Sequence, residues 1–207
     1  MTAPVALFGA GGHGTVLLDA LHRAGRRICA VVDPKQRTGL PIDAPRYTEE
    51  AAFFGEHPRQ SVEIAIGLGH TPRGTARREM FVRLRRDGAV LCSVIHPAAI
   101  IGAGVDLGVG VQLMAGSVVQ SHACLGNDVV VNTRASVDHD CRIGDHVHVA
   151  PGAVLLGEVE VGAAAFIGAG AVIERGRRIG AGAVVGMNAT VLADVPEGAR
   201  AYGRWTG

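Results

Sequence analysis

Aliphatic side chains recur at every sixth position over the second half of the chain. The series begins at Ile101 and ends at Val191, and all sixteen of its positions hold Ile, Leu or Val. The fourth residue after each aliphatic is small or β-branched in fifteen cases, and Arg177 is the exception. A six-residue unit is too short for a helical repeat but holds one short strand and one corner. The pattern therefore predicts a parallel β-helix over residues 95–207.

The same spacing predicts the register between coils. If three six-residue units form one triangular coil, residues eighteen positions apart stack, so that Ile101 lies beneath Val119 and Val119 beneath Val137. Glycine directly follows the aliphatic residue at eight positions: Gly102, Gly108, Gly126, Gly144, Gly162, Gly168, Gly180 and Gly186. We expect these glycines to supply the backbone freedom that a corner needs.

The first ninety residues alternate short apolar runs with polar segments. Apolar runs at Val5–Phe8, 28–33, Val62–Gly69 and Val90–Ile95 predict four short strands, and the basic run Arg73–Arg86 predicts a helix. Strands that alternate with helices are typical of a parallel sheet. Residues 1–94 are therefore expected to form an α/β, Rossmann-like half domain, ahead of the β-helix domain over 95–207.

A glycine-rich turn follows the first apolar run. Residues Gly9–Gly14 fit the spacing GxGxxG, and the second apolar run ends in Asp33. In a strand-turn-helix context this spacing indicates nucleotide binding, with backbone N–H groups facing phosphate. Half of a dinucleotide domain favours a mononucleotide or a nucleotide-linked sugar over NAD. A turn without phosphate is the alternative, and His13 either contacts phosphate or caps the helix.

Composition narrows the choice of partners. Glycine makes up 30 of 207 residues while aromatic residues make up only 4%, which indicates repeated tight turns. A net charge of +1 argues against nucleic acid or an anionic membrane as the main partner. No apolar stretch reaches about 18 residues and no signal peptide is recognisable, so we expect a soluble, cytoplasmic protein. The four cysteines show no CxxC spacing, which favours buried free thiols.

Four histidines gather within the repeats: His122, His139, His146 and His148. A metal cluster, a general base with an orienting acid, and inert solvated side chains are the competing explanations. His139 and Asp140 follow Val137 by two and three residues, which predicts that both lie at a corner. An imidazole can accept a proton at neutral pH, and an adjacent carboxylate can fix its tautomer.

Several motifs together resemble one family. They are Asn132-Thr133, Asp138-His139-Asp140, His148-Val149-Ala150-Pro151-Gly152 and the turn Gly9–Gly14. The chain resembles the hexapeptide-repeat nucleotide-sugar acetyltransferases, which include bacillosamine and perosamine N-acetyltransferases and sialic-acid O-acetyltransferases. The resemblance implies a left-handed β-helix, a homotrimer, and acetyl-CoA-dependent acetylation of the amino group of a nucleotide-linked amino sugar, most simply a 4-amino-4,6-dideoxy sugar.

The resemblance also implies roles for individual residues. His139 matches the general base, and Asp140 matches an acidic residue that increases its basicity and is Glu in the bacillosamine enzymes. His148, Ala169 and Met187 match positions at the acetyl-CoA site, and no metal is expected. The residues implied at the nucleotide sugar are Gly11, Gly12, His13, Asp33, Lys35 and Gly67. His122 and His146 match no family role and are expected at the surface, and the tail AYGRWTG departs from the usual ending.

Three other functions fit parts of the sequence. Acetylation of a sugar hydroxyl needs the same base as acetylation of an amine. A zinc hydratase of the carbonic anhydrase type would need three of the four histidines as ligands and would leave the glycine turn unexplained. A nucleotide-sensing scaffold would use the β-helix only to oligomerise. The sequence does not distinguish among GDP, UDP and dTDP.

Overall fold

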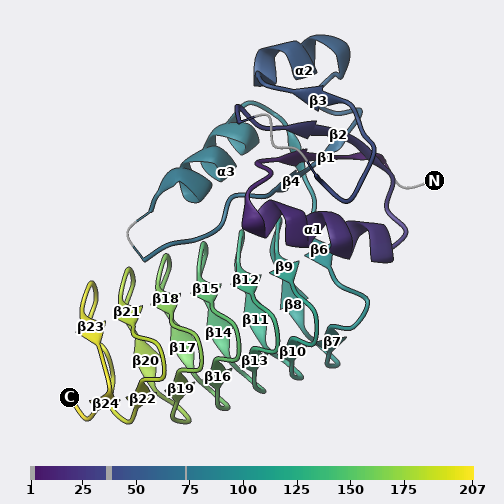
Figure 1. Cartoon of the computed structure of the whole chain (residues 1–207). Coiled ribbons are helices and arrows are strands. Elements are labelled where there is room, and N and C mark those ends of the chain that lie inside the picture. The colour runs from purple at the N-terminus through teal and green to yellow at the C-terminus, as the bar shows by residue number, and fades with distance from the viewer. Residues whose placement is uncertain (1–2, 36–38, 73) are drawn as a thin grey trace. The chain divides into compact units, whose positions relative to one another are not determined.

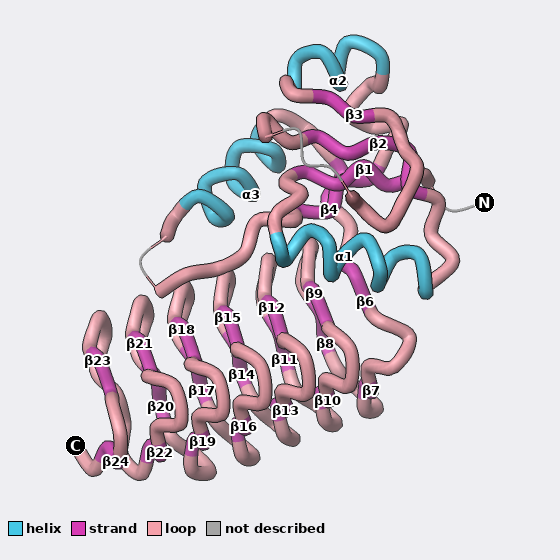
Figure 2. The backbone as a smooth tube through the Cα atoms, in the orientation of Figure 1, coloured by secondary structure: helices cyan, strands magenta, loops and turns pink. Residues whose placement is uncertain are grey.

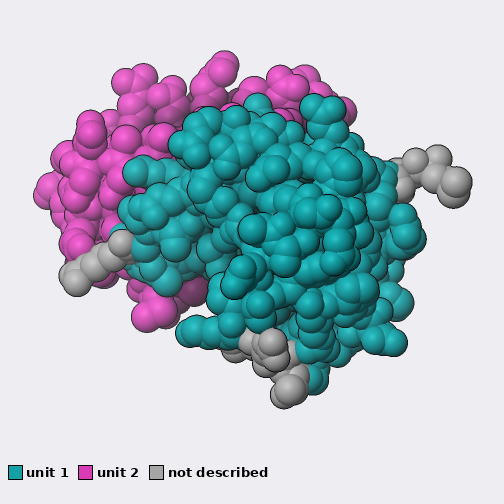
Figure 3. Space-filling view, turned by 90° about the horizontal axis from the view of Figure 1, so that it is seen from above, with its two compact units in different colours: residues 1–97 teal, residues 98–207 magenta. Residues whose placement is uncertain are grey.

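The computed structural model describes residues 3–35, 39–72 and 74–207. Contacts within the chain divide it into two compact units, Met1–Pro97 and Ala98–Gly207, coloured separately in Figure 3. Among the described residues, no helix is both long enough and apolar enough to span a bilayer.

The first unit is built around a parallel sheet of five strands. They are β1 (Val5–Phe8), β2 (Ile28–Val32), β3 (Arg46–Tyr47), β4 (Glu63–Ile66) and β5 (Val90–Leu91). The strand order is β3-β2-β1-β4-β5, and every neighbouring pair is parallel. The chain reverses its direction of progress across the sheet between β1 and β4, which is where α/β sheets of this kind bind ligands.

Three helices connect these strands (Figures 1 and 2): α1 (Gly12–Arg23), α2 (Glu50–Glu56) and α3 (Ala76–Arg86). The predicted α/β fold is confirmed, with two differences in detail. β3 and α2 were not predicted, and the single strand expected at Val90–Ile95 is two strands, β5 and β6 (Val94–Ile95). The predicted start of the basic helix at residue 73 lies outside the described residues.

The second unit is the predicted left-handed parallel β-helix, drawn as a row of stacked coils in Figure 1. Its first sheet contains β7 (Ile100–Ile101), β10 (Val118–Val119), β13 (Ser136–Val137), β16 (Val154–Leu155), β19 (Val172–Ile173), β22 (Thr190–Val191) and β24 (Arg204–Trp205). The second contains β8 (Asp106–Leu107), β11 (Cys124–Leu125), β14 (Arg142–Ile143), β17 (Glu160–Val161) and β20 (Arg178–Ile179). The third includes β9 (Gln112–Leu113), β12 (Val130–Val131), β15 (His148–Val149), β18 (Phe166–Ile167), β21 (Val184–Val185) and β23 (Arg200–Ala201).

The predicted register is confirmed. Val119 pairs with Val137 on one side and with Ile101 on the other, so residues eighteen apart stack from coil to coil. Nearly all of the aliphatics, and of the small residues four positions later, are buried in one continuous core, and Ile101 in the first coil is exposed. Arg177, the exception in the small set, is only partly buried, and its Nε lies 3.1 Å from Glu174 Oε2.

The glycines that directly follow the aliphatics have a different role from the predicted one. The glycines directly after the aliphatics do not have positive φ. They are needed because coils approach closely there: a Cβ on Gly108 would lie 2.5 Å from the carbonyl carbon of Gly126. The left-handed conformation instead falls three residues after the aliphatic, at fifteen of sixteen corners, and includes Asp140 with φ 59°.

Candidate functional site

A pocket of about 610 Å³ opens at the carboxyl ends of β1, β2 and β4. All six residues predicted to bind the nucleotide sugar line this pocket: Gly11, Gly12, His13, Asp33, Lys35 and Gly67. They come from three separate segments, so the sheet order brings together side chains that are distant in sequence. The pocket lies beside the point between β1 and β4 where the strand order reverses, the usual ligand site of such sheets.

The glycine turn allows the first strand and helix to pack closely. A Cβ on Gly14 or on Gly67 would collide with the carbonyl oxygen of Gly9, so glycine is required at both positions. Helix α1 begins at Gly12, next to the pocket. In an α-helix the first N–H groups point out of the N-terminus and not toward carbonyl oxygens of the helix. Such N–H groups, together with the helix dipole, favour an anion at this position.

Asp33 holds the loops of the pocket in place. Its Oδ2 accepts a hydrogen bond from the N–H of Ala10 at 2.5 Å, and its Oδ1 accepts one from the N–H of Lys35 at 2.7 Å. The carboxylate therefore joins the glycine turn after β1 to the segment after β2. Both oxygens already carry a backbone partner, which gives Asp33 a structural role in the pocket in addition to the predicted contact with the nucleotide.

Arg77 supports the third segment of the pocket from inside the unit. It is almost fully buried, and its Nη1 donates to the carbonyl oxygens of Ile66 and Leu68, each at 2.9 Å. These bonds fix the backbone on both sides of Gly67. Sequence reasoning missed Arg77, because a basic helical run gives no sign of which arginine turns inward.

Glu50 also lines the pocket and was not predicted. Its two carboxylate oxygens accept from Arg83 Nη2 and Nη1, each at 2.7 Å. This ion pair raises the pKa of the Arg83 guanidinium and joins α2 to α3. Without β3 and α2 in the predicted fold, the sequence offered no reason to bring Glu50 to the pocket.

In the second unit, His139 and Asp140 lie at the corner between β13 and β14, as predicted. His139 Nδ1 is 2.7 Å from Asp140 Oδ2, and the backbone N–H of His139 donates to Asp138 Oδ1 at 2.8 Å. The two side chains are 46% and 53% exposed. With Nδ1 engaged by a carboxylate, the other ring nitrogen is the one available to accept a proton.

The thiol next in sequence does not take part in this chemistry. Burial raises the pKa of Cys141 to about 11, and its Sγ lies 3.3 Å from the carbonyl oxygen of Leu156, as a donor. The thiolate is the nucleophilic form of cysteine, and it is scarce at neutral pH for such a group. The corner therefore offers a base and not a cysteine nucleophile.

The residues predicted at the acetyl-CoA site lie elsewhere on the β-helix. His148 is on β15 in the third sheet, almost buried, and its ring stacks on Phe166 with centroids 5.0 Å apart. Ala169 and Met187 stack at the corner between the third and first sheets, and Met187 is 77% exposed. This corner and the corner of His139 are at opposite edges of the first sheet. A single β-helix therefore does not bring His139 and Asp140 together with the residues predicted to bind acetyl-CoA.

His122 and His146 behave differently from each other. His122 is exposed, as expected. The expectation for His146 is wrong: its side chain is only 13% exposed, and its Nδ1 lies 3.0 Å from Oδ2 of Asp128, whose side chain is 1% exposed. The two residues stack because they are eighteen apart, both three residues after an aliphatic. Among the described residues, no three side chains of the His, Cys, Asp and Glu types are arranged to hold a metal ion.

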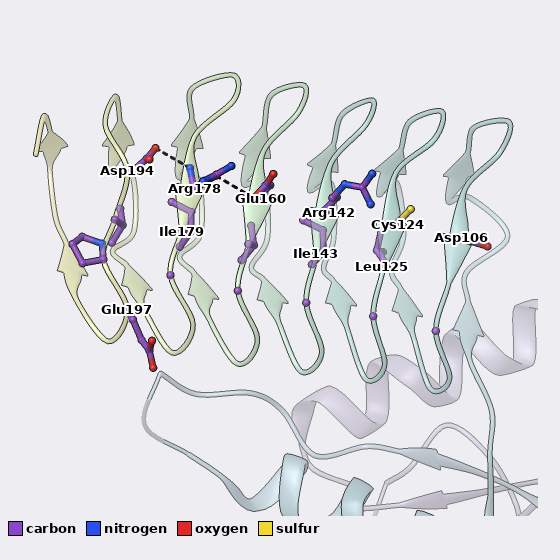
Figure 4. A pocket seen from close by; sticks show the side chains of 18 of the residues that line it. Asp106, Cys124, Leu125, Arg142, Ile143, Glu160, Arg178, Ile179, Asp194 and Glu197 are labelled. Carbon is purple, nitrogen blue, oxygen red and sulfur yellow. Dashed lines mark hydrogen bonds and ion pairs between the residues drawn. The ribbon is translucent and has the colours of Figure 1, made fainter.

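A second hollow, in the second unit, contains none of the predicted residues. It is an open groove of about 960 Å³ along the outer face of the second sheet, shown in Figure 4. Four carboxylates and two guanidinium groups are among its lining, and Arg178 Nε lies 3.2 Å from Glu160 Oε2. We assign no chemistry to this groove.

Comparison with known proteins identifies the family. The PglD N-terminal domain matches residues 4–83, and the bacterial transferase hexapeptide (six repeats) matches residues 125–157. PerB from Caulobacter crescentus, solved in complex with CoA and GDP-perosamine, is 31% identical, with a TM-score of 0.86 over 98% of this chain and 95% of PerB. The chain belongs to the hexapeptide-repeat sugar acetyltransferases.

Two other members of this family have similar structures. The acetyltransferase domain of PglB from Neisseria gonorrhoeae FA1090, in complex with acetyl coenzyme A, is 29% identical, with a TM-score of 0.87 over 98% of this chain and 97% of that domain. WeeI from Acinetobacter baumannii AYE is 27% identical, with a TM-score of 0.84 over 96% of each chain. These matches extend over both units, so the family assignment covers the whole two-unit architecture.

Proposed function

We propose that this sugar acetyltransferase transfers an acetyl group from acetyl-CoA to the amino group of a nucleotide-linked amino sugar, with His139 as the general base. The observation that carries the proposal is the 2.7 Å contact between His139 Nδ1 and Asp140 Oδ2 at an accessible corner. PerB binds CoA and GDP-perosamine, and the PglB domain binds acetyl coenzyme A, which supports the same pair of substrate classes here.

The reaction requires one base and no covalent enzyme intermediate. The sugar nitrogen attacks the thioester carbon, a C–N bond forms, and the C–S bond breaks to release the CoA thiolate, which takes up the proton that leaves the nitrogen. The attacking nitrogen becomes positively charged and must lose a proton, which His139 Nε2 accepts. Asp140 keeps the ring in the tautomer that leaves Nε2 unprotonated and stabilises the imidazolium that forms.

The two units divide the substrates between them in this proposal. The pocket of the first unit holds the nucleotide, with its diphosphate at the N-terminus of α1 and Lys35 nearby as a cation. The second unit supplies His139 and, at another corner, the acetyl-CoA contacts of His148, Ala169 and Met187. No further contribution from a metal ion is needed, because a thioester is already activated for attack.

A homotrimer is part of the proposal. His139 and the predicted acetyl-CoA residues lie at different corners of one β-helix, so a site that contains both needs a neighbouring copy. Exposed apolar side chains at the first sheet, among them Ile100 and Val172, support an interface between copies on that sheet. The mass of the particle in solution, measured by light scattering, tests this: a monomer at micromolar concentration contradicts it.

The substrate classes are tested by a screen. The protein is incubated with acetyl-CoA and GDP-, UDP- or dTDP-linked 4-amino-4,6-dideoxy sugars, each paired with the sugar that carries a hydroxyl in place of the amine. We expect thiol release and an acetylated product with at least one amino sugar and not with its hydroxyl partner. Turnover of the hydroxyl sugars alone would establish O-acetylation, and tight nucleotide binding without any thiol release would indicate a scaffold.

A further inference from the structure

One position of the six-residue unit holds a glycine only once. Two residues after each aliphatic, fifteen of the sixteen positions from 103 to 193 carry a side chain, and the exception is Gly157. Gly157 is not among the residues with positive φ. The β-helix therefore accommodates a Cβ at this place in its corner, and neither the repeat nor the backbone conformation explains the glycine.

The neighbour of Gly157 in the preceding coil explains it. His139 lies eighteen residues earlier, so the two residues stack, and the N–H of Glu158 donates to the carbonyl oxygen of His139 at 2.9 Å. The three heavy atoms nearest to a Cβ on Gly157 would all belong to the His139 ring: Nε2 at 2.5 Å, Cε1 at 2.6 Å and Cδ2 at 3.2 Å. The imidazole occupies the space that any side chain at residue 157 would need.

The orientation of the ring follows from these two contacts. Nδ1 is directed to Asp140 Oδ2, and the side of the ring with Nε2, Cε1 and Cδ2 lies where a Cβ on Gly157 would be. A methyl group at residue 157 would displace the ring by rotation about its side-chain torsions, because the ring is the movable partner and the backbone of the stacked coils is not. The same rotation would separate Nδ1 from Asp140.

We propose that Gly157 is a positioning residue for His139: its missing side chain lets the imidazole hold Asp140 with one nitrogen while Nε2 stays at the corner. This inference rests on the proposed function only for its effect on catalysis. The effect on the ring itself is a property of the protein without substrates and is measured separately.

The first test uses no substrate. In ¹⁵N NMR spectra of the protein, the His139 ring is expected to give the pattern of a single tautomer with the proton on Nδ1 and, in Gly157→Ala, a pattern shifted toward the other tautomer, as in Asp140→Asn. An unchanged His139 pattern in Gly157→Ala would overturn the proposal. This result does not depend on whether the protein acetylates a sugar, so its failure is distinct from failure of the proposed function.

The second test is a double-mutant cycle on the acetyl-transfer rate. Gly157→Ala is expected to lower kcat about tenfold to a hundredfold, the range that a misplaced reacting group produces. In a His139→Ala background, Gly157→Ala is expected to have no further effect, because the group it displaces is gone. Equal effects of Gly157→Ala in both backgrounds would show that residue 157 acts independently of His139 and would overturn the proposal.

Folding of the variants supplies a third test. If Gly157→Ala folds poorly, the variant that also carries His139→Ala is expected to recover the stability, because removal of the imidazole makes room for the methyl group. If the single and double variants lose stability equally, the methyl group at residue 157 collides with backbone atoms and not with the imidazole. That outcome would also overturn the proposal.

Discussion

Nδ1 of His139 and Oδ2 of Asp140 lie 2.7 Å apart, although the two residues are neighbours in sequence. Adjacent side chains in a strand point to opposite faces, and this contact forms because Asp140 adopts φ 59° at the corner. The left-handed conformation that closes this corner, like nearly all others of the β-helix, thus also turns the carboxylate back toward the imidazole.

Asp140→Asn is expected to lower kcat by about threefold to fivefold. Asparagine tolerates the left-handed conformation, so the corner keeps its shape, but the neutral amide stabilises an imidazolium less well. The effect is modest because an exposed ion pair contributes at most about 1 kcal/mol. Steady-state kinetics with Asp106→Asn as the control, an exposed acidic residue on β8, check this. A loss as large as that of His139→Ala would mean that Asp140 does more than orient and stabilise the ring.

Removal of the His146 side chain is expected to affect stability and not catalysis. His146→Gly should lower the free energy of unfolding by about 1–3 kcal/mol, because the buried Asp128 carboxylate loses a hydrogen-bond partner. His122→Gly is a matched control, since His122 has φ 62° against 60° for His146 and is exposed. Glycine adopts this conformation without strain at both positions. Urea unfolding of the two variants measures the difference, and similar curves would contradict a stabilising His146–Asp128 contact.

Asp33→Asn is expected to weaken nucleotide binding about tenfold to a hundredfold. The amide of asparagine can accept a hydrogen bond from only one of the N–H groups of Ala10 and Lys35, and its own NH₂ faces the other donor. The lost hydrogen bond to a charged group is worth about 1.5–3 kcal/mol. Calorimetric titration with the nucleotide diphosphate of the accepted sugar measures the effect, and Asp43→Asn, an exposed acidic residue outside the pocket lining, is the control. Unchanged affinity would show that the loops hold their positions without this carboxylate.

Cys92 and Cys141 are expected to resist alkylation in the folded protein at pH 8. Burial raises the pKa of Cys92 to about 12 and that of Cys141 to about 11, so at pH 8 only about one Cys141 thiol in a thousand is ionised. Because a raised pKa favours the thiol, reactivity should appear only as the pH rises toward these values. Mass spectrometry after iodoacetamide treatment checks this, with the partly exposed Cys124 as the reactive control. Rapid labelling of Cys141 at pH 8 would show that its corner opens.

The β-helix was predictable because its rule is local and repeated. One aliphatic residue in six, without an exception, specifies a strand, a corner and a coil. The first unit was predicted less completely: β3 is only two residues long, and α2 follows Glu49, which makes no capping hydrogen bond through its side chain. Neither element leaves a periodic pattern that a short window can distinguish from a loop.

The site was predictable where residues touch along the chain or match a family motif, and less so where they touch across coils. The corner location of His139 and Asp140 follows from counting after Val137. The His146–Asp128 contact and the place of His139 next to Gly157 also follow from the eighteen-residue register, but only when that register is applied to corner residues as well as to the core. The role of Asp33 as an acceptor for two backbone N–H groups depends on how two loops approach each other, which no spacing in the sequence encodes.

The proton-accepting role of His139 is tested most directly by the rate of acetyl transfer in His139→Ala, with acetyl-CoA and the amino-sugar nucleotide that the wild-type protein accepts. We expect a fall in kcat/KM of about a hundredfold to ten-thousandfold, the contribution of a general base, with the folded state retained and with His122→Gly close to wild type. A His139→Ala variant that retains wild-type kcat/KM would contradict this role.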